Sequence, residues 1–247
     1  MRRRALVPLL FSGSLLFAHA GQLCAGATHF HRGTATVDGV EDPLEWAGAE
    51  YGEATLVLPA GLGGGSTQVT FLVMSDDNYL YAAVRFPYAS SPSAPAFLDF
   101  AVQFWADGAT ACNATTPLDV VQLISWSNSA EFRDEHWPLC NTVIPDTSAG
   151  GSSDGTGSWE DEGATLFFEL SHPLDSSDDS HDVSAVSPGF VQLKPFAYGC
   201  DAAANCSSTS CGTPIVIGSR SISATREASA SARWRVTTSS PRSPVRH

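Results

Sequence analysis

Three tryptophans lie among polar side chains between residues 103 and 137. Trp105, Trp126 and Trp137 can supply flat aromatic faces of the kind that stack on the apolar face of a pyranose ring. Polar side chains that can hydrogen-bond sugar hydroxyls stand between them: Gln122, Glu131, Arg133 and Asp134. We expect Trp126 and Trp137 to lead such a site, with Trp137 in a loop. A core position for each tryptophan, and a salt bridge for Arg133, are the alternatives.

A second group of side chains suits a metal ion. Four carboxylates stand close together in one acidic stretch: Asp175, Asp178, Asp179 and Asp182. Clustered oxygen ligands are those that Ca²⁺ prefers, although the spacing here is not that of an EF-hand. The stretch therefore favours a calcium loop, with a solvated acidic loop as the alternative in so acidic a chain.

The sequence contains no catalytic motif that would indicate an enzyme. The chain has no H-E-x-x-H, P-loop or dinucleotide-binding pattern. Paired carboxylates can hydrolyse glycosides, but the chain has 26 Asp and Glu residues, so their presence does not discriminate. We expect a protein that is not an enzyme.

The N-terminus has the features of a secretory signal peptide. Three arginines at positions 2–4 precede an apolar run, and Ala18-His19-Ala20 forms a small-residue cleavage motif. The apolar run is too short to span a membrane. We expect removal of residues 1–20 and secretion to the extracellular space or the periplasm.

Six cysteines follow this leader, which favours disulfides in an oxidising compartment. They are Cys24, Cys112, Cys140, Cys200, Cys206 and Cys211. We expect Cys112 to pair with Cys140. Two of the last three cysteines should pair with each other, and the third should reach Cys24. The spacing lacks C-x-x-C pairs and does not favour zinc.

Charge is distributed unevenly along the chain. The net charge is −13, yet residues 220–247 carry six arginines and one glutamate. These residues, rich in Ser and Ala, are expected to form a disordered basic tail. The acidic excess of the remaining body argues against binding to a nucleic-acid backbone.

The elements that must position these residues are strands. Apolar and polar residues alternate, or apolar residues run on, in eight short segments: 54–58, 69–74, 80–86, 97–105, 120–126, 165–170, 191–198 and 214–217. Segments 69–74 and 80–86, joined by a turn at 76–78, predict a hairpin. We expect one all-β domain over residues 21–219. Its fold should be an antiparallel β-sandwich of immunoglobulin-like or jelly-roll type, stapled by disulfides.

Three motifs resemble those of family 9 carbohydrate-binding modules. They are residues 36–46 (TVDGVEDPLEW), residues 76–84 (DDNYLYAAV) and residues 168–174 (FELSHPL) with the acidic and glycine positions that follow. The resemblance covers about residues 34–219 and implies a secreted, non-catalytic domain that binds a glycan or polysaccharide. Of its residues, Asp38 and Gly39 predict a tight turn and Trp46 a packed anchor. Glu169 should face solvent or satisfy a loop.

The same superfamily includes DOMON-type domains, which hold haem between a methionine and a histidine or lysine. The resemblance therefore implies an alternative function in haem b binding. Met74 would be one ligand and His172, His181 or Lys194 the other. Alternation in its strand equally makes Met74 a core residue. A structural or adhesive domain without a small ligand is a further alternative.

Overall fold

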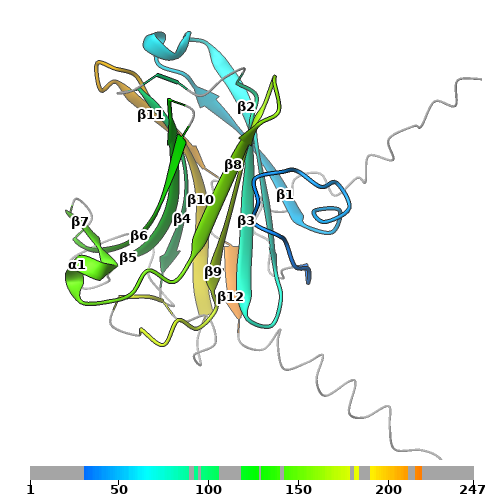
Figure 1. Ribbon diagram of the computed structural model, residues 1–247, viewed down its shortest axis with the longest axis vertical. Helices are drawn as coiled ribbons and strands as arrows, with labels where there is room; N and C mark the ends of the chain where they lie inside the picture. Colours follow the sequence, from blue (N-terminus) through cyan, green and yellow to red (C-terminus); the bar gives the residue numbers. More distant parts are fainter. Residues whose placement is uncertain are drawn as a thin grey trace, which may run out of the picture.

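The computed structural model describes residues 31–88, 92–93, 96–105, 118–127, 129–139, 142–178, 181–183, 190–210 and 215–218. Its strands form two antiparallel sheets that pack into a sandwich (Figure 1). This confirms the all-β fold that the strand pattern predicts. Several predictions lie outside the described residues: the signal peptide (1–20), the tail (220–247), Cys24, Cys112, Cys140, Cys211 and Asp179.

The first sheet has five strands in the order β1-β2-β3-β9-β8. They are β1 (Glu50–Val57), β2 (Ser66–Ser75), β3 (Tyr79–Phe86), β8 (Thr156–Asp161) and β9 (Leu166–Pro173). The predicted hairpin of β2 and β3 is confirmed. Its turn is closed by Asp76, whose Oδ1 accepts hydrogen bonds of 2.7 Å and 2.8 Å from the backbone N–H groups of Asn78 and Tyr79.

The second sheet has the order β11-β10-β4-β5-β6-β7, and β12 also pairs with β10. Its strands are β4 (Phe97–Trp105), β5 (Leu118–Trp126), β6 (Ser129–Leu139), β7 (Thr142–Pro145), β10 (Phe190–Cys200), β11 (Cys206–Ser210) and β12 (Ile215–Gly218). The prediction that Trp137 lies in a loop is wrong, because Trp137 lies in β6 and pairs with Leu118. Many of the side chains of β6 are polar, so its sequence lacks the apolar signal of a strand.

Helical structure is limited to one 3₁₀ turn, η2 (Ala60–Leu62), and one short helix, α1 (Asp146–Ala149), within the described residues. Neither of these two elements of the described residues is long and apolar enough to cross a membrane.

Apolar side chains from alternate strand positions fill the space between the sheets. Phe71 of β2, Phe100 of β4 and Phe168 of β9 are wholly buried there. The rings of Phe71 and Phe100 lie 6.3 Å apart, so the two sheets meet through direct aromatic contact. Burying each such side chain contributes roughly 1.5–3 kcal/mol, which makes this layer the main source of stability.

The N-terminal segment, residues 31–49, covers the outer face of the first sheet (Figure 1, blue). Trp46 packs there against Phe167 of β9, with the rings edge to face at 6.3 Å. Gly39 has a φ of +91°, and a Cβ atom there would lie 2.6 Å from the Trp159 backbone. The segment therefore needs glycine at the Asp38–Gly39 turn.

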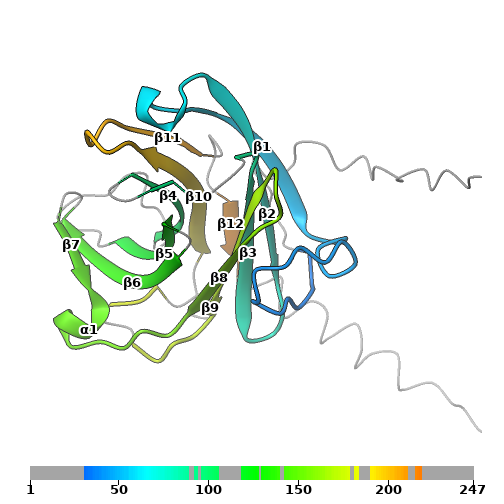
Figure 2. The ribbon, with the colours of Figure 1, turned by 45° about the horizontal axis from the view of Figure 1, so that its top comes forward.

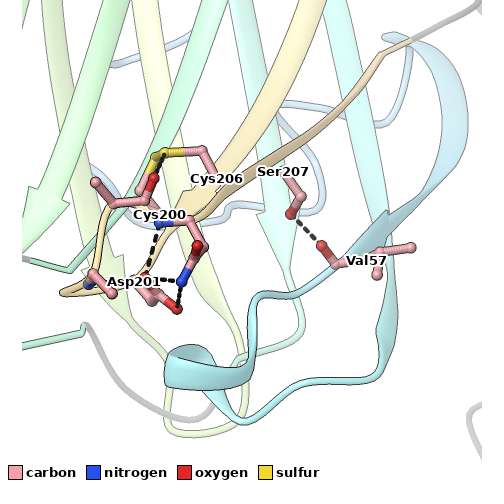
Figure 3. Close-up of a disulfide and its surroundings, with 8 residues drawn as sticks. Val57, Cys200, Asp201, Cys206 and Ser207 are labelled. Carbon is pink, nitrogen blue, oxygen red and sulfur yellow. Dashed lines mark hydrogen bonds between the residues drawn. A yellow bond between two sulfur atoms is a disulfide. The ribbon is translucent and has the colours of Figure 1, made fainter.

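A disulfide joins Cys200 at the end of β10 to Cys206 at the start of β11 (Figure 3). This confirms that two of the last three cysteines pair. The turn between them is organised by Asp201, whose Oδ1 accepts hydrogen bonds from the backbone N–H groups of Ala203 (2.9 Å) and Asn205 (3.0 Å). Ser207 then donates a hydrogen bond to the carbonyl of Val57, which ties β11 to the first sheet.

Candidate functional site

The outer groove is a depression on the face of the second sheet that points away from the first. Alternate side chains of β4, β5, β6 and β10 line it, together with Cys206 of β11. Figure 2 shows that the second sheet curves around this side. The lining residues are Phe97, Asp99, Ala101, Gln103, Val120, Gln122, Trp137, Tyr198, Cys200 and Cys206. The groove encloses about 260 Å³. This lies just below the range of about 300–1,000 Å³ that is typical of pockets for drug-sized ligands, so the groove suits a ligand smaller than these.

The floor of the outer groove is apolar. Ala101 and Val120 line it and belong, with Leu118, to a buried apolar cluster. Two aromatic lining residues, Trp137 and Tyr198, pack against this cluster, as does Phe196 beside them. The indole Nε1 of Trp137 donates a hydrogen bond of 3.2 Å to Oε2 of Glu135, which fixes the orientation of the ring. The rings of Phe196 and Tyr198 stack at 6.0 Å. The groove therefore offers fixed aromatic surface to a ligand.

Four polar side chains of this face are buried: Asp99, Gln103, Gln122 and Glu135. Asp99 Oδ1 has no hydrogen-bond partner among the described residues. Burial, reinforced by the charge of Glu135, raises the pKa of Asp99 to about 8. Burial also raises the pKa of Glu135, although the hydrogen bond from Trp137 opposes this. A carboxyl group that keeps its proton near neutral pH can both donate to and accept from a ligand hydroxyl.

Arg133 lies on the same face and confirms the salt-bridge alternative. Its Nε and Nη2 atoms donate to the two carboxylate oxygens of Glu131 at 3.0 Å and 3.1 Å. Its Nη1 lies 3.9 Å from Oε1 of the buried Glu135. Arg133 also stands opposite Gln122 in the β5–β6 register. The guanidinium thus connects an exposed and a buried carboxylate at the edge of the groove.

Two other candidates of the predicted sugar site, Trp126 and Asp134, do not line the groove. Trp126 ends β5 at the opposite end from Leu118, the register partner of Trp137, and does not line the groove. Trp105 ends β4, but its side chain is outside the described set. Asp134 faces the space between the sheets, because it alternates with the groove-facing residues of β6. The structure therefore brings together only part of the predicted group.

Asp134 belongs instead to the Asp/His cluster, a buried group between the two sheets. The cluster contains Asp119 of β5, Asp134 of β6, His172 of β9 and Asp182 of segment 181–183. One ligand atom from each residue lies within 4.8 Å of the other three. All four side chains are buried, and the group can hold a metal ion.

The electrostatics of the cluster are those of carboxylates removed from water. Burial, together with the neighbouring carboxylates, raises the pKa of Asp119 well above its usual range and that of Asp134 to about 7. Asp146 at the start of α1 is also buried, and burial and the adjacent Asp182 raise its pKa to about 8. Burial lowers the pKa of His172, which favours the neutral imidazole.

The predicted calcium loop contributes one residue to this cluster. Of the three described aspartates of the loop, only Asp182 reaches it. Asp178 instead contacts His181 at 2.8 Å and accepts a hydrogen bond from the backbone of Ser152. Asp175 is exposed and closes a local turn. Two partners of Asp182, Asp119 and Asp134, come from strands far away in the sequence, so the acidic loop alone could not define the group.

The residues of the haem alternative lie in three separate layers. Met74 packs beside Trp46 on the outer face of the first sheet. His172 lies between the sheets, where its ring is 5.2 Å from that of Phe104. Lys194 lies over the ring of Phe196 on the outer face of the second sheet. With His181 held by Asp178, Met74 has no predicted partner within reach, and the core alternative for Met74 is the correct one.

Sequence reasoning missed Asp99 and Tyr198 in the groove, Glu135 beside Trp137 on the same face, and Asp119 in the cluster. A signal existed for the two aspartates, because aspartate is depleted in strands and both stand inside apolar runs. Asp119 alternates in phase with the inward Val121, whereas Asp99 is in phase with Ala101 on the other face. A carboxylate at such a buried position needs a partner, a ligand or a proton.

Comparison with known proteins finds similarity at the level of structure. No family model and no curated protein sequence matches the chain. One similar structure is a family 9 carbohydrate-binding module from Caldicellulosiruptor kristjanssonii in complex with cellotriose. It has 12% identity and a TM-score of 0.45, covering 74% of this chain and 83% of that one. Another is a family 9 module from the same organism with glucose, with 12% identity, a TM-score of 0.43, and coverage of 73% and 83%. Both belong to the family whose motifs the sequence resembles.

Proposed function

We propose that the protein is a secreted, non-catalytic carbohydrate-binding domain whose ligand site is the outer groove. The observation that carries the proposal is the combination of Trp137 and Tyr198 on an apolar floor with buried polar side chains beside them. A pyranose presents a ring face of C–H groups and an edge of hydroxyls, and this groove offers a partner for each.

Asp99 and Gln103 supply the polar half of the site. Both side chains are less than a tenth exposed, and Asp99 keeps one oxygen without a donor. A buried acceptor without a partner costs roughly 1–3 kcal/mol, and a sugar hydroxyl that donates to it would remove that cost. Gln122, opposite Arg133, extends the polar edge across β5 and β6.

The framework of the groove supports binding without large movement. Its side chains stand on four hydrogen-bonded strands and on the disulfide-linked turn after β10. Sites on rigid strands lose little conformational entropy when they bind a ligand. Secretion belongs to the proposal through the leader-like residues 1–20, because a signal peptide would deliver the domain to where polysaccharides occur.

A glycan array probed with the purified chain, followed by calorimetry on the strongest binder, tests this function. Trp137→Ala should lower affinity at least about tenfold, since it removes an aromatic platform of roughly 1–3 kcal/mol. Trp126→Ala is the matched variant, since it removes an indole from the same sheet outside the groove, and it should retain binding. Failure of the wild-type protein to retain any glycan would remove the proposal, as would release of reducing ends from the bound glycan.

A further inference from the structure

We propose that the Asp/His cluster is a binding site for a divalent transition-metal ion that joins the two sheets. Its ligands are Asp119 and Asp134 from the second sheet, His172 from the first sheet, and Asp182 from segment 181–183. This site is separate from the outer groove, because Asp119 and Asp134 point to the opposite side of strands β5 and β6.

Unpartnered ligand atoms are the first argument. His172 Nε2, both carboxylate oxygens of Asp182, and one oxygen each of Asp119 and Asp134 are buried without a hydrogen-bond partner in the described part of the chain. His172 Nε2 and Asp182 Oδ2 lie 4.0 Å apart, too far for a hydrogen bond. Buried polar atoms of native proteins are almost always paired, so unpartnered atoms on four residues whose ligand atoms lie within 4.8 Å of one another call for a ligand.

The charge of the group points to a cation. Three carboxylates meet here, and Asp146 places a fourth beside Asp182. The arginine ion pairs of the described residues lie elsewhere, at Asp77, Glu41, Glu131 and Glu135. Buried carboxylates are stable when they are paired or when they coordinate a metal, and no basic side chain among these pairs performs that role.

Two of the carboxylates are already held in place for coordination. Asp134 Oδ2 accepts a hydrogen bond of 2.8 Å from the backbone N–H of Asp154, and Asp119 Oδ2 accepts one of 3.1 Å from that of Val183. In each case the other oxygen, Oδ1, is the unpartnered one. One oxygen thus positions the side chain while its neighbour remains available, which is the arrangement of ligands supported by an outer shell.

His172 brings a nitrogen ligand to the same place. Its side chain is buried, and its Nε2 atom has no hydrogen-bond partner in the described part of the chain. A neutral imidazole can offer the lone pair of this nitrogen to a metal ion.

The imidazole of His172 indicates which class of metal ion the site prefers. Calcium and magnesium take oxygen ligands, whereas imidazole nitrogen combined with carboxylates suits ions such as Zn²⁺ and Mn²⁺. The ligand atoms lie close enough together for one ion at bond lengths of about 2.0–2.2 Å after small shifts. Ca²⁺, expected from the acidic loop, would leave His172 Nε2 without its preferred partner.

Calorimetry and thermal unfolding of the full chain, stripped with EDTA and titrated with ZnCl₂, MnCl₂ or CaCl₂, test the site. We expect one equivalent of Zn²⁺ or Mn²⁺ to bind at least about tenfold more tightly than Ca²⁺ and to raise the melting temperature. Asp182→Asn should abolish that gain. His172→Phe, which keeps a ring against Phe104, should weaken Zn²⁺ binding by about 10- to 100-fold.

Two matched variants test whether neighbouring side chains, and not the cluster, bind the metal ion. His181→Gln removes the imidazole of the partly exposed pair with Asp178, and Asp175→Asn removes a carboxylate of the acidic loop; both should bind Zn²⁺ as the wild type does. Binding that is lost in His181→Gln but kept in His172→Phe and Asp182→Asn would overturn the proposal. So would tighter binding of Ca²⁺ than of Zn²⁺ and Mn²⁺, or no binding of any of the three ions. Should both cluster variants fail to fold, Co²⁺ bound to the wild-type protein must show ligand-field absorption bands of a nitrogen- and oxygen-ligated site, and their absence would overturn it.

Discussion

The indole Nε1 of Trp46 donates a hydrogen bond of 2.8 Å to Oε1 of Glu169, 123 positions further along the chain. The second oxygen of Glu169 accepts hydrogen bonds from the backbone N–H groups of Gly39 (2.8 Å) and Asp38 (3.2 Å). The first and last of the three family-like motifs therefore meet in one buried contact. This contact attaches the N-terminal segment to the outer face of the first sheet.

Replacing Trp46 by phenylalanine should destabilise the domain. The substitution keeps an aromatic ring against Phe167 but leaves Glu169 Oε1 without its donor, at a cost of roughly 1–3 kcal/mol. Urea unfolding followed by circular dichroism measures the loss. Trp159→Phe is the matched control, since Trp159 is only half-buried beside Phe168, and its loss should be smaller. Equal losses would contradict a specific role for the hydrogen bond.

Glu169 should make stability fall as pH rises. Burial raises the pKa of this carboxyl to about 7 in spite of the hydrogen bonds from Gly39 and Trp46. The folded state therefore binds more protons than the unfolded state between pH 4.5 and pH 7, the two pKa values for this group. The contribution of Glu169 to the free energy of unfolding is present in full below the pKa that this group has in the unfolded chain. It is lost as the pH rises through the pKa of about 7 that the group has in the folded protein. Urea unfolding across this window should show a shallower decline for Glu169→Gln than for the wild type; parallel curves would refute this.

Asp99→Ala should change affinity and stability in different directions. The substitution removes a polar partner from the outer groove, so affinity for the bound glycan should fall about tenfold. Because Asp99 Oδ1 is buried without a donor, the free energy of unfolding should stay the same or rise. Calorimetry and urea unfolding measure the two quantities. Glu160→Ala, at an exposed carboxylate of β8 outside the groove, is the control and should alter neither.

Breaking the disulfide between Cys200 and Cys206 should loosen one wall of the groove. The bond closes a short loop, with a sequence separation of 6, and both cysteines line the groove. Loops of this size contribute about 2 kcal/mol through the unfolded state. We expect the double variant Cys200→Ser, Cys206→Ser to unfold at lower urea and to bind glycan more weakly. The hydrogen bond between Asp201 and Asn205 should preserve the register of β10 and β11 in this variant. The far-ultraviolet circular dichroism spectrum should therefore remain unchanged.

Much of the fold follows from local patterns. Alternation at β2 and β3, with Asp76 between them, predicts a hairpin because side chains two apart share a face. Trp46 is predicted as an anchor, and it is 4% exposed. The pattern does not predict β6, because both of its faces carry buried carboxylates. Glu135 lies on the face of the outer groove and Asp134 in the Asp/His cluster, so the apolar signal is interrupted on both sides.

The candidate sites depend on tertiary structure in a different way. Trp137 and Gln122 were identifiable as aromatic and polar candidates, yet only the β5–β6 register places them on one face, together with Asp99 of β4. Trp126, equally suitable by residue type, lies at the other end of the same strand. Residue types predict the chemistry that a site needs but not which members of the set meet.

The sequence by itself determined an antiparallel sandwich, its central hairpin and the packing of Trp46, since these follow from alternation, turn residues and residue type along the chain. It did not determine the burial of Glu169, which was expected to face solvent or satisfy a loop and is wholly buried. Only the tertiary structure decided that Asp119, Asp134, His172 and Asp182 share one point. These residues come from four separate segments of the two sheets and a loop, and no spacing rule links them. Their proximity follows from strand order, register and sheet packing, which are set by the whole core and not by any one stretch of sequence.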